Sequence, residues 1–208
     1  MKLPHDLIDH SQWTLVGPMG PSLPEHLSRY PIMGIDGGAK YCPHLDVWLG
    51  DGDSLTGPVE ARHFFRFPPQ KDHSDLSMAL GFLTESCHYR LHLWGFLGGR
   101  KDHELFNLGE TLTFLETHPQ SEAFFYDHAG KVSFHLLARG NWKIHHNGSF
   151  SIGTHRQTRL TINGQCAYPL HQPRILAPLS SLGLSNEGHG DIFLENEGPV
   201  FVYFQEQK

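Results

Sequence analysis

The chain has 208 residues, of which 38% are hydrophobic and 18% are charged, and its net charge at pH 7 is −6. This composition predicts one large or two small domains with a packed core and excludes a largely disordered chain. The acidic balance argues against nucleic-acid binding, which usually requires a basic face. No stretch approaches the ~18 apolar residues of a membrane helix and the N-terminus lacks an apolar signal core, so we expect no membrane association.

Strand and helix patterns alternate through the first two-thirds of the chain. We predict strands at 13–17, 31–36, 46–50, 64–67, 89–96 and 122–126. One helix is expected after Ser74, an N-cap residue, with an apolar stripe over 76–83. A second is expected from Asp102, with an apolar face over 105–115. Strands separated by helices predict an α/β N-terminal domain with a mainly parallel, Rossmann-like sheet over residues 1–130.

The pattern changes after about Lys131, where no long helical stripe remains. Short β-like runs are predicted at 132–138, 142–146, 150–153, 159–162, 192–195 and 200–204. The pairs Asn147-Gly148 and Asn163-Gly164 are typical of hairpin turns between such runs. We therefore predict a small all-β sandwich over residues 131–208.

The cysteines predict the cellular compartment of the protein, whereas the histidines do not predict a metal site. Cys42, Cys87 and Cys166 are odd in number and widely spaced, which fits a reducing cytoplasm better than a disulfide framework. The 17 histidines are scattered, without the spacing of a zinc site. We expect a cytoplasmic protein and attribute the histidines to composition.

Three acidic stretches each follow a predicted strand: GDGDS at 50–54, KDHSDL at 71–76 and GGRKDH at 98–103. The carboxyl ends of strands in an α/β sheet face the crevice where ligands bind. Asp51, Asp53, Asp75 and Asp102 are therefore expected to converge on one hard cation. With the guanidinium of Arg100 beside them, the expected ligand is a polyphosphate carried by Mg²⁺.

Each stretch also has a simpler interpretation. Asp51 and Asp53 fit a solvent-exposed acidic turn about equally well. Asp72 and Asp75 flank a helix start, where capping alone explains them. The stretch at 98–103 fits a strand–helix turn, although the position of Arg100 between glycines and a carboxylate favours a functional role.

The order of the motifs resembles that of the thiamine pyrophosphokinase family. The resemblance rests on DGGA at 36–39, the three acidic stretches and Ser185-Asn186-Glu187, and it covers about residues 32–187. That family transfers the pyrophosphoryl group of ATP to the hydroxyl of thiamine and releases AMP. The resemblance implies ATP and thiamine as substrates, Mg²⁺ as cofactor, and a homodimer in which the β domain of one chain completes the site of the other.

The resemblance also implies a role for each matching residue. The catalytic set is Asp51, Asp53, Asp75, Arg100 and Asp102, whose four carboxylates would bind Mg²⁺. The residues expected around ATP are Asp36, Gly37, Gly38, Ser54, Asp72, Ser74, His103 and Asn107. Tyr168 would stack on a thiamine ring, and Ser185 and Asn186 would contact the pyrimidine. Apart from the resemblance, we expect one carboxylate, either Asp75 or Asp102, to accept the proton of the hydroxyl.

Two departures from the family pattern leave alternatives open. Gly52 stands where the family usually has an aromatic residue, and Gln165-Cys166 stand where it has Gly-Leu. One alternative is a related pyrophosphokinase that acts on another alcohol, such as a hydroxymethylpterin. The other is a non-catalytic protein that binds a nucleotide or thiamine diphosphate.

Overall fold

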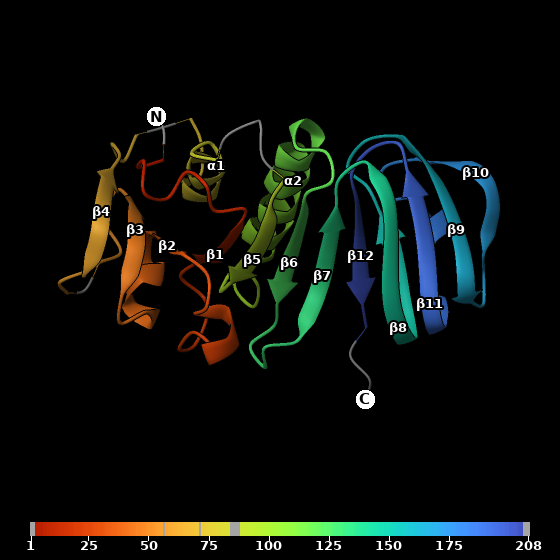
Figure 1. The fold of residues 1–208 in the computed structure, drawn as a ribbon, viewed down its shortest axis with the longest axis horizontal. Helices are drawn as coiled ribbons and strands as arrows, with labels where there is room; N and C mark the ends of the chain where they lie inside the picture. Colours follow the sequence, from red (N-terminus) through yellow and green to blue (C-terminus); the bar gives the residue numbers. More distant parts are fainter. Residues whose placement is uncertain (1–2, 56, 71, 84–87, 206–208) are drawn as a thin grey trace. The chain divides into compact units, whose positions relative to one another are not determined.

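The computed structural model describes residues 3–55, 57–70, 72–83 and 88–205, so Lys71 and Cys87 lie outside the described residues. Within these ranges, the strands form two runs of neighbours, β6-β5-β1-β2-β3-β4 and β10-β9-β11-β8-β12-β7 (Figure 1). The chain divides into two compact units. The first comprises Met1–Thr111 and Ala123–Lys131, and the second comprises Leu112–Glu122 and Val132–Lys208.

Parallel strands form the centre of the first unit. Strand β1 (Gln12–Val16) pairs with β2 (Ile32–Ile35) and with β5 (Arg90–Trp94). Strand β3 (Leu45–Gly50) pairs with β2 and with β4 (Ala61–Arg66). The residues of β1, β2 and β5 are nearly all buried, as expected of parallel strands covered on both faces, and the buried residues include the polar Thr14 and His92.

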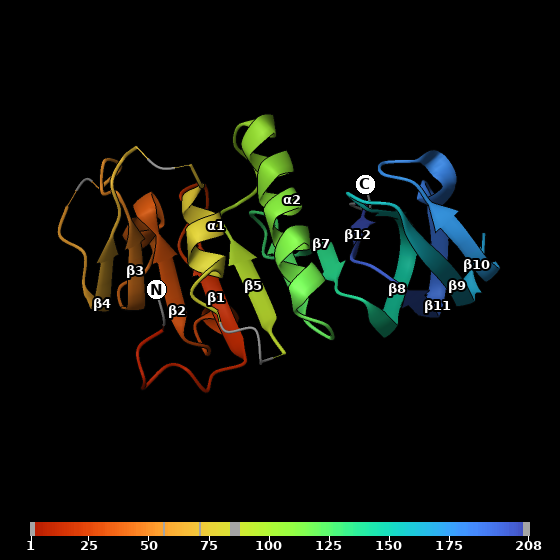
Figure 2. The same ribbon diagram turned by 90° about the horizontal axis from the view of Figure 1, so that it is seen from above.

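The two α-helices begin at the predicted places. Helix α1 (Asp75–Leu80) starts after Ser74, whose Oγ accepts a hydrogen bond of 3.0 Å from the backbone N–H of Ser77. Helix α2 (Lys101–Thr117) follows β5, and α1 contacts β2 and β3 (Figure 2). None of the described helices is long and apolar enough to cross a lipid bilayer. Leu105, predicted on the apolar face of α2, is instead 58% exposed.

The predicted Rossmann-like α/β class is wrong. Strands β1 to β4 are joined without α-helices: β1 and β2 by a loop with the 3-10 helix Glu25–Leu27, and β2 and β3 by the 3-10 helix Asp36–Tyr41. These connections are rich in proline and glycine, for example Pro18, Pro21 and Pro24 in the first. Such residues disfavour α-helices, so the strand signals predicted the sheet but not the short connections.

The predicted β-sandwich is wrong as well, because the strands of the second unit form one continuous run rather than two packed sheets. The run contains β7 (Val132–Leu137), β8 (Gly140–Gly153), β9 (Thr158–Cys166), β10 (Leu170–Leu176), β11 (Asn186–Asn196) and β12 (Val200–Phe204). Strand β11 pairs with both β8 and β9, and β12 pairs with both β7 and β8. A core that includes Phe150, Ile162 and Leu194 packs within this unit.

Two predicted turns lie inside strands. Asn147 and Gly148 belong to β8 and pair with His189 and Gly188 of β11. Asn163 and Gly164 belong to β9, near a register shift in its pairing with β11. At this irregularity the backbone N–H of Asp191 donates to the side-chain Oε1 of Gln165 at 2.9 Å. The amide side chain thus replaces a missing ladder partner, which gives Gln165 a structural role.

Candidate active site

Three carboxylates gather at the ends of β2 and β3 in the first unit. One oxygen each from Asp36, Asp51 and Asp53 lies within 4.8 Å of the others. Carboxylates this close repel one another unless a proton or a cation compensates their charge. Oxygen ligands of this kind suit Mg²⁺, so the donor set fits the cation that the sequence predicted.

Asp36 has the most unusual environment of the three. Its backbone φ is 47°, a left-handed value that is uncommon for residues other than glycine. Its Oδ1 is buried and has no hydrogen-bond partner among the described residues. The indole Nε1 of Trp48 donates to the Asp36 carbonyl at 3.1 Å and helps to hold this conformation. Strained backbone and an unsatisfied carboxylate oxygen are both features of ligand-binding positions.

The loop after β3 is held by contacts of its own. The N–H of Asp53 donates to Oδ1 of Asp51 at 3.1 Å, and the hydroxyl of Ser54 donates to Asp53 at 2.9 Å. Nε of Arg66 donates to the carbonyl of Asp51 at 3.0 Å, and Gly52 has a φ of 83°. The side chain of Arg66 packs beside Gly52 from β4, and the positive φ is what favours glycine at this position.

A cavity of about 630 Å³ adjoins the carboxylate cluster. Asp36 belongs both to the cluster and to the lining of the cavity. The sequence-predicted residues in the lining are Asp36, Ser54, Ser74, Asp75, Arg100, His103 and Asn107. The structure therefore brings residues from all three acidic stretches to one cavity in the first unit.

Arg100 and Asp102 form a pair at one side of this cavity. Nε of Arg100 donates to Oδ1 of Asp102 at 3.1 Å, and Nη2 donates to Oδ2 in a two-pronged contact. The hydrogen bond from Arg100 lowers the pKa of Asp102 to about 2, while Asp102 in turn raises the pKa of Arg100. Both side chains are largely exposed, so they remain accessible to a ligand. A carboxyl with so low a pKa is a weak proton acceptor.

Two of the residues predicted around ATP, Ser74 and Asn107, already have protein partners. Besides capping α1, the hydroxyl of Ser74 donates to Oε2 of Glu110 on α2. The amide Nδ2 of Asn107 donates to the carbonyl of Phe96 at 3.2 Å. Asp72 is exposed and is not among the residues that line the cavity.

The glycines predicted near ATP have a packing reason. A Cβ on Gly38 would collide with the carbonyl oxygen of Val16, and one on Gly37 would lie 3.2 Å from the Cβ of Ser54. The 3-10 helix that follows β2 therefore packs against the end of β1 only because Gly38 lacks a side chain, and Gly37 leaves room for the loop that carries Ser54.

The predicted substrate residues belong to the second unit. The ring of Tyr168 is 68% exposed, as a stacking surface must be. Asn186 is buried, and its side chain accepts from the N–H of Tyr168 at 3.0 Å and donates to the Tyr168 carbonyl at 2.8 Å. Asn186 thus holds the main chain of Tyr168. Ser185 has a φ of 57°, and its N–H donates to Oγ of Ser151 at 3.0 Å.

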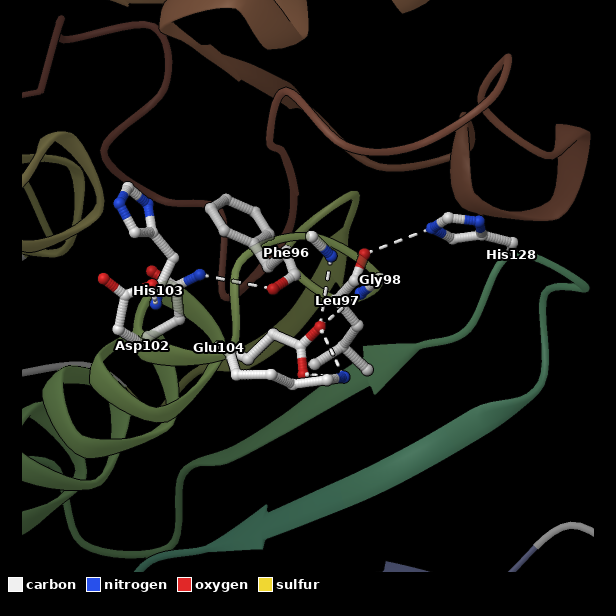
Figure 3. A network of polar contacts seen from close by, with 10 residues as sticks. Phe96, Leu97, Gly98, Asp102, His103, Glu104 and His128 are labelled. Atoms are coloured by element: carbon white, nitrogen blue, oxygen red, sulfur yellow. Dashed lines mark hydrogen bonds and ion pairs between the residues drawn. The ribbon is translucent and has the colours of Figure 1, made fainter.

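The sequence analysis missed residues that support the site. Glu104 lines the cavity, and its carboxylate accepts hydrogen bonds from the N–H groups of Gly98 and Gly99 (Figure 3). An acidic residue in the first turn of a helix, shortly after two glycines, was the available signal, because such residues often bind the N–H groups that precede the helix. Arg66 and Glu110 lie outside the three acidic stretches, and no local pattern indicated them.

A smaller cavity of about 300 Å³ lies in the second unit around Glu116 and Arg156. Glu116 already contacts His155 at 2.9 Å and Arg156 at 3.0 Å. Burial lowers the pKa of His155, and the contact with Glu116 only partly opposes this effect. The larger cavity gathers seven predicted site residues, and we therefore place the candidate active site there.

A carboxylate cluster beside a cavity with an accessible arginine is characteristic of enzymes that transfer phosphoryl groups with Mg²⁺. No protein-family model matches the sequence, and no curated protein matches it. Solved structures do match. Thiamine pyrophosphokinase from Bacillus subtilis superposes with a TM-score of 0.69 and 20% identity, covering 94% of this chain and 100% of that chain.

Thiamin pyrophosphokinases from two further organisms also match. The protein from Geobacillus thermodenitrificans gives a TM-score of 0.66 at 20% identity, covering 95% of this chain and 99% of that one. The Candida albicans protein gives 0.64 at 13% identity, covering 92% and 88%. The chain therefore has the fold of the thiamine pyrophosphokinases, and the resemblance seen in the order of the motifs is confirmed at the level of the fold.

Proposed function

We propose that this chain is a thiamine pyrophosphokinase that transfers the pyrophosphoryl group of ATP to the hydroxyl of thiamine and releases AMP. The observation that carries the proposal is the convergence of Asp36, Asp51 and Asp53 beside a cavity that Arg100 and Asp75 also line. The shared fold supports the same activity, because the structures that match are named as enzymes of this kind.

Asp36, Asp51 and Asp53 would hold Mg²⁺, which would neutralise phosphate charge and orient the phosphate oxygens when bound. Asp36 enters this set because its buried Oδ1 lacks a protein partner among the described residues. Asp75 lines the cavity and remains a predicted ligand of the cation. Asp102 also remains one, although its carboxylate already contacts Arg100.

The remaining steps fall to side chains around the cavity. Arg100 would bind phosphate oxygens of ATP through its planar guanidinium, at the side where Asp102 now accepts its N–H groups. The oxygen of the alcohol attacks the β-phosphorus, the bond from the β-phosphorus to the oxygen of the α-phosphate breaks, and AMP leaves. We assign the alcohol proton to Asp75, since a pKa of about 2 makes Asp102 the weaker base.

The direct test measures AMP and thiamine diphosphate formed from ATP and Mg²⁺, with and without thiamine. We expect AMP to appear only with thiamine, in equal amount to thiamine diphosphate. The same assay with a panel of other alcohols, including a hydroxymethylpterin, separates thiamine from related substrates. A chain that forms no AMP with thiamine would overturn the proposal. Asp9→Asn, at an exposed position in the first unit, is the control for loss of one carboxylate.

We further propose that the chain acts as a homodimer in the cytoplasm. The second unit exposes Tyr168, Ile175, Leu179 and Leu184, which are apolar or aromatic side chains suited to a protein contact. The thiols of Cys42 and Cys166 are both free, which fits a reducing compartment.

Mixing two inactive variants tests whether the site combines units of different chains. Asp51→Asn disables the first unit and Tyr168→Ala the second. Random pairing of subunits then gives about a quarter of the wild-type activity, because half of the dimers are mixed and one of their two sites is intact. If the mixture stays inactive after subunit exchange has been verified, the proposal that two chains share one active site is wrong.

A further inference from the structure

The segment between β5 and α2 is anchored through its backbone. The carbonyl of Phe96 accepts from Nδ2 of Asn107 at 3.2 Å, and the carbonyl of Leu97 lies 3.1 Å from Nε2 of His128. Figure 3 shows that His128 reaches the segment from the turn after β6, whereas Asn107 belongs to α2. Gly98 has a φ of 86°, and a Cβ here would collide with the ring of His128. The glycine is therefore required by this packing.

Glu104 binds the two N–H groups of the same segment. Its Oε1 accepts from Gly98 at 2.7 Å and from Gly99 at 3.1 Å. Nζ of Lys101 lies 3.0 Å from Oε2 and balances the charge. The Glu104 side chain is only 17% exposed. Burial opposes ionisation, but the hydrogen bonds from Lys101 and the two glycines prevail and lower the pKa of Glu104, so the group stays charged at neutral pH.

Two consecutive N–H groups in a glycine turn before a helix form a position that commonly binds a phosphate oxygen. In this chain a carboxylate of the protein occupies that position. The N–H groups of Gly98 and Gly99 are consequently used for an internal contact. Phosphate binding on this side of the cavity then depends on Arg100, the residue that directly follows the turn.

We propose that Glu104 is a positioning residue that fixes the Gly98–Gly99 turn and thereby holds Arg100 at the cavity. The inference rests on the proposed function, because Arg100 is taken to bind the phosphates of ATP. The carboxylate acts through the backbone and does not touch the substrate. Its acceptor oxygens carry the effect, so an uncharged side chain with a carbonyl oxygen in the same place retains most of it.

The test compares Glu104→Gln, which keeps an acceptor, with Glu104→Ala, which does not. In Glu104→Ala we expect faster amide hydrogen exchange at Gly98 and Gly99 and a KM for Mg·ATP raised about tenfold, with the KM for thiamine unchanged. Glu104→Gln should stay within about threefold of the wild type in both measurements. Glu25→Ala, another carboxylate of the first unit at an exposed position, is the matched control.

Three results would overturn the inference. One is a Glu104→Ala variant with wild-type exchange and kinetics. Another is a lower KM for Mg·ATP, which would mean that Glu104 competes with phosphate for the turn. The third is a lower melting temperature and kcat with both KM values unchanged, which would mark a purely structural residue.

Binding measurements separate this inference from the proposed function. Calorimetry with Mg²⁺ and an ATP analogue that cannot be cleaved between the α- and β-phosphates requires no turnover. If the wild type makes no thiamine diphosphate but Glu104→Ala still weakens analogue binding about tenfold, the function fails and the positioning role stands. If the wild type is active and Glu104→Ala binds the analogue normally, the positioning role fails and the function stands.

Discussion

The loops that follow β3 and β5 both combine glycines with aspartates, but their charged side chains are arranged differently. After β3, one carboxylate oxygen each from Asp51 and Asp53 lies within 4.8 Å of one from Asp36. After β5, each charged side chain has a partner of opposite sign, Arg100 with Asp102 and Lys101 with Glu104. The first loop brings like charges together, which is the arrangement expected of a cation site, whereas the second pairs opposite charges and exposes an arginine. Acidic residues after a strand thus indicate a site without indicating its charge balance.

The largest expected effect comes from removing one charge from the cluster. Asp51→Asn keeps the size of the side chain and should lower the rate of AMP formation by roughly a hundredfold or more, because an electrostatic contact at the phosphates is lost. Circular dichroism and the melting temperature should stay near those of the wild type. A variant that keeps more than about a tenth of the activity would remove Asp51 from the catalytic set.

Asp36→Asn tests whether the third carboxylate belongs to the metal site. Asparagine tolerates the left-handed backbone at this position, so the fold should be retained. We expect the Mg²⁺ concentration for half-maximal activity to rise about tenfold, since one anionic ligand is lost. An unchanged Mg²⁺ dependence would show that Asp36 has only a structural role.

Arg100→Gln removes the ion pair between Arg100 and Asp102 in the loop after β5. The pKa of Asp102 should rise from about 2 toward its ordinary value of 3.8, because the hydrogen bond and charge of Arg100 are lost. NMR titration of the Asp102 carboxyl measures this directly, and a pKa that stays near 2 would show that Arg100 is not the cause.

The same variant carries a prediction for the pH dependence of stability. A carboxyl with a lower pKa in the folded state stabilises the fold above its unfolded pKa, and this contribution is lost as the pH falls through about 2. The difference in melting temperature between wild type and Arg100→Gln should therefore shrink between pH 4 and pH 2. It should be small throughout, since both side chains are largely exposed.

The smallest effect is expected at the start of α1. Ser74→Ala removes the cap of this helix and the contact with Glu110, and should lower the free energy of unfolding by about 1 kcal/mol. Ser77→Ala, in the same helix, is the control because only its backbone N–H makes the capping bond. If the two variants have equal stability in urea titrations, the cap contributes nothing measurable.

Local patterns predicted strands and caps well because those features depend on neighbouring residues. The bounds 122–126 and 200–204 match β6 and β12, and Ser74 caps α1 as predicted. The class of the fold was wrong, because it depends on how strands are connected and which strands pair. Strand β10 was missed because most of its residues are exposed and it lacks an apolar alternation.

The site could be predicted as a set of motifs but not as a geometry. Of the residues in the motifs, Asp75 and Arg100 are among those that line the cavity, whereas Asp51, Asp53, Asp72 and Asp102 are not. Asp36 lies beside Asp51 and Asp53, and its backbone is left-handed. The residues next to Asp36 in the sequence do not predict this backbone conformation. The anchoring by Glu104 depends on a side chain that folds back on the turn before its own helix.

The contacts of Asn186 make position 168 suitable for redesign. The side chain of Asn186 forms hydrogen bonds with the backbone N–H and the backbone carbonyl of residue 168. Every amino acid except proline has both groups. The aromatic ring of Tyr168 is largely exposed and is not involved in these hydrogen bonds. Exchanging tyrosine for tryptophan, phenylalanine or histidine therefore leaves the path of the chain unchanged while altering the face offered to a ring. If Tyr168 stacks on a substrate ring as the resemblance implies, a small library at this single position would vary the substrate range without rebuilding the scaffold.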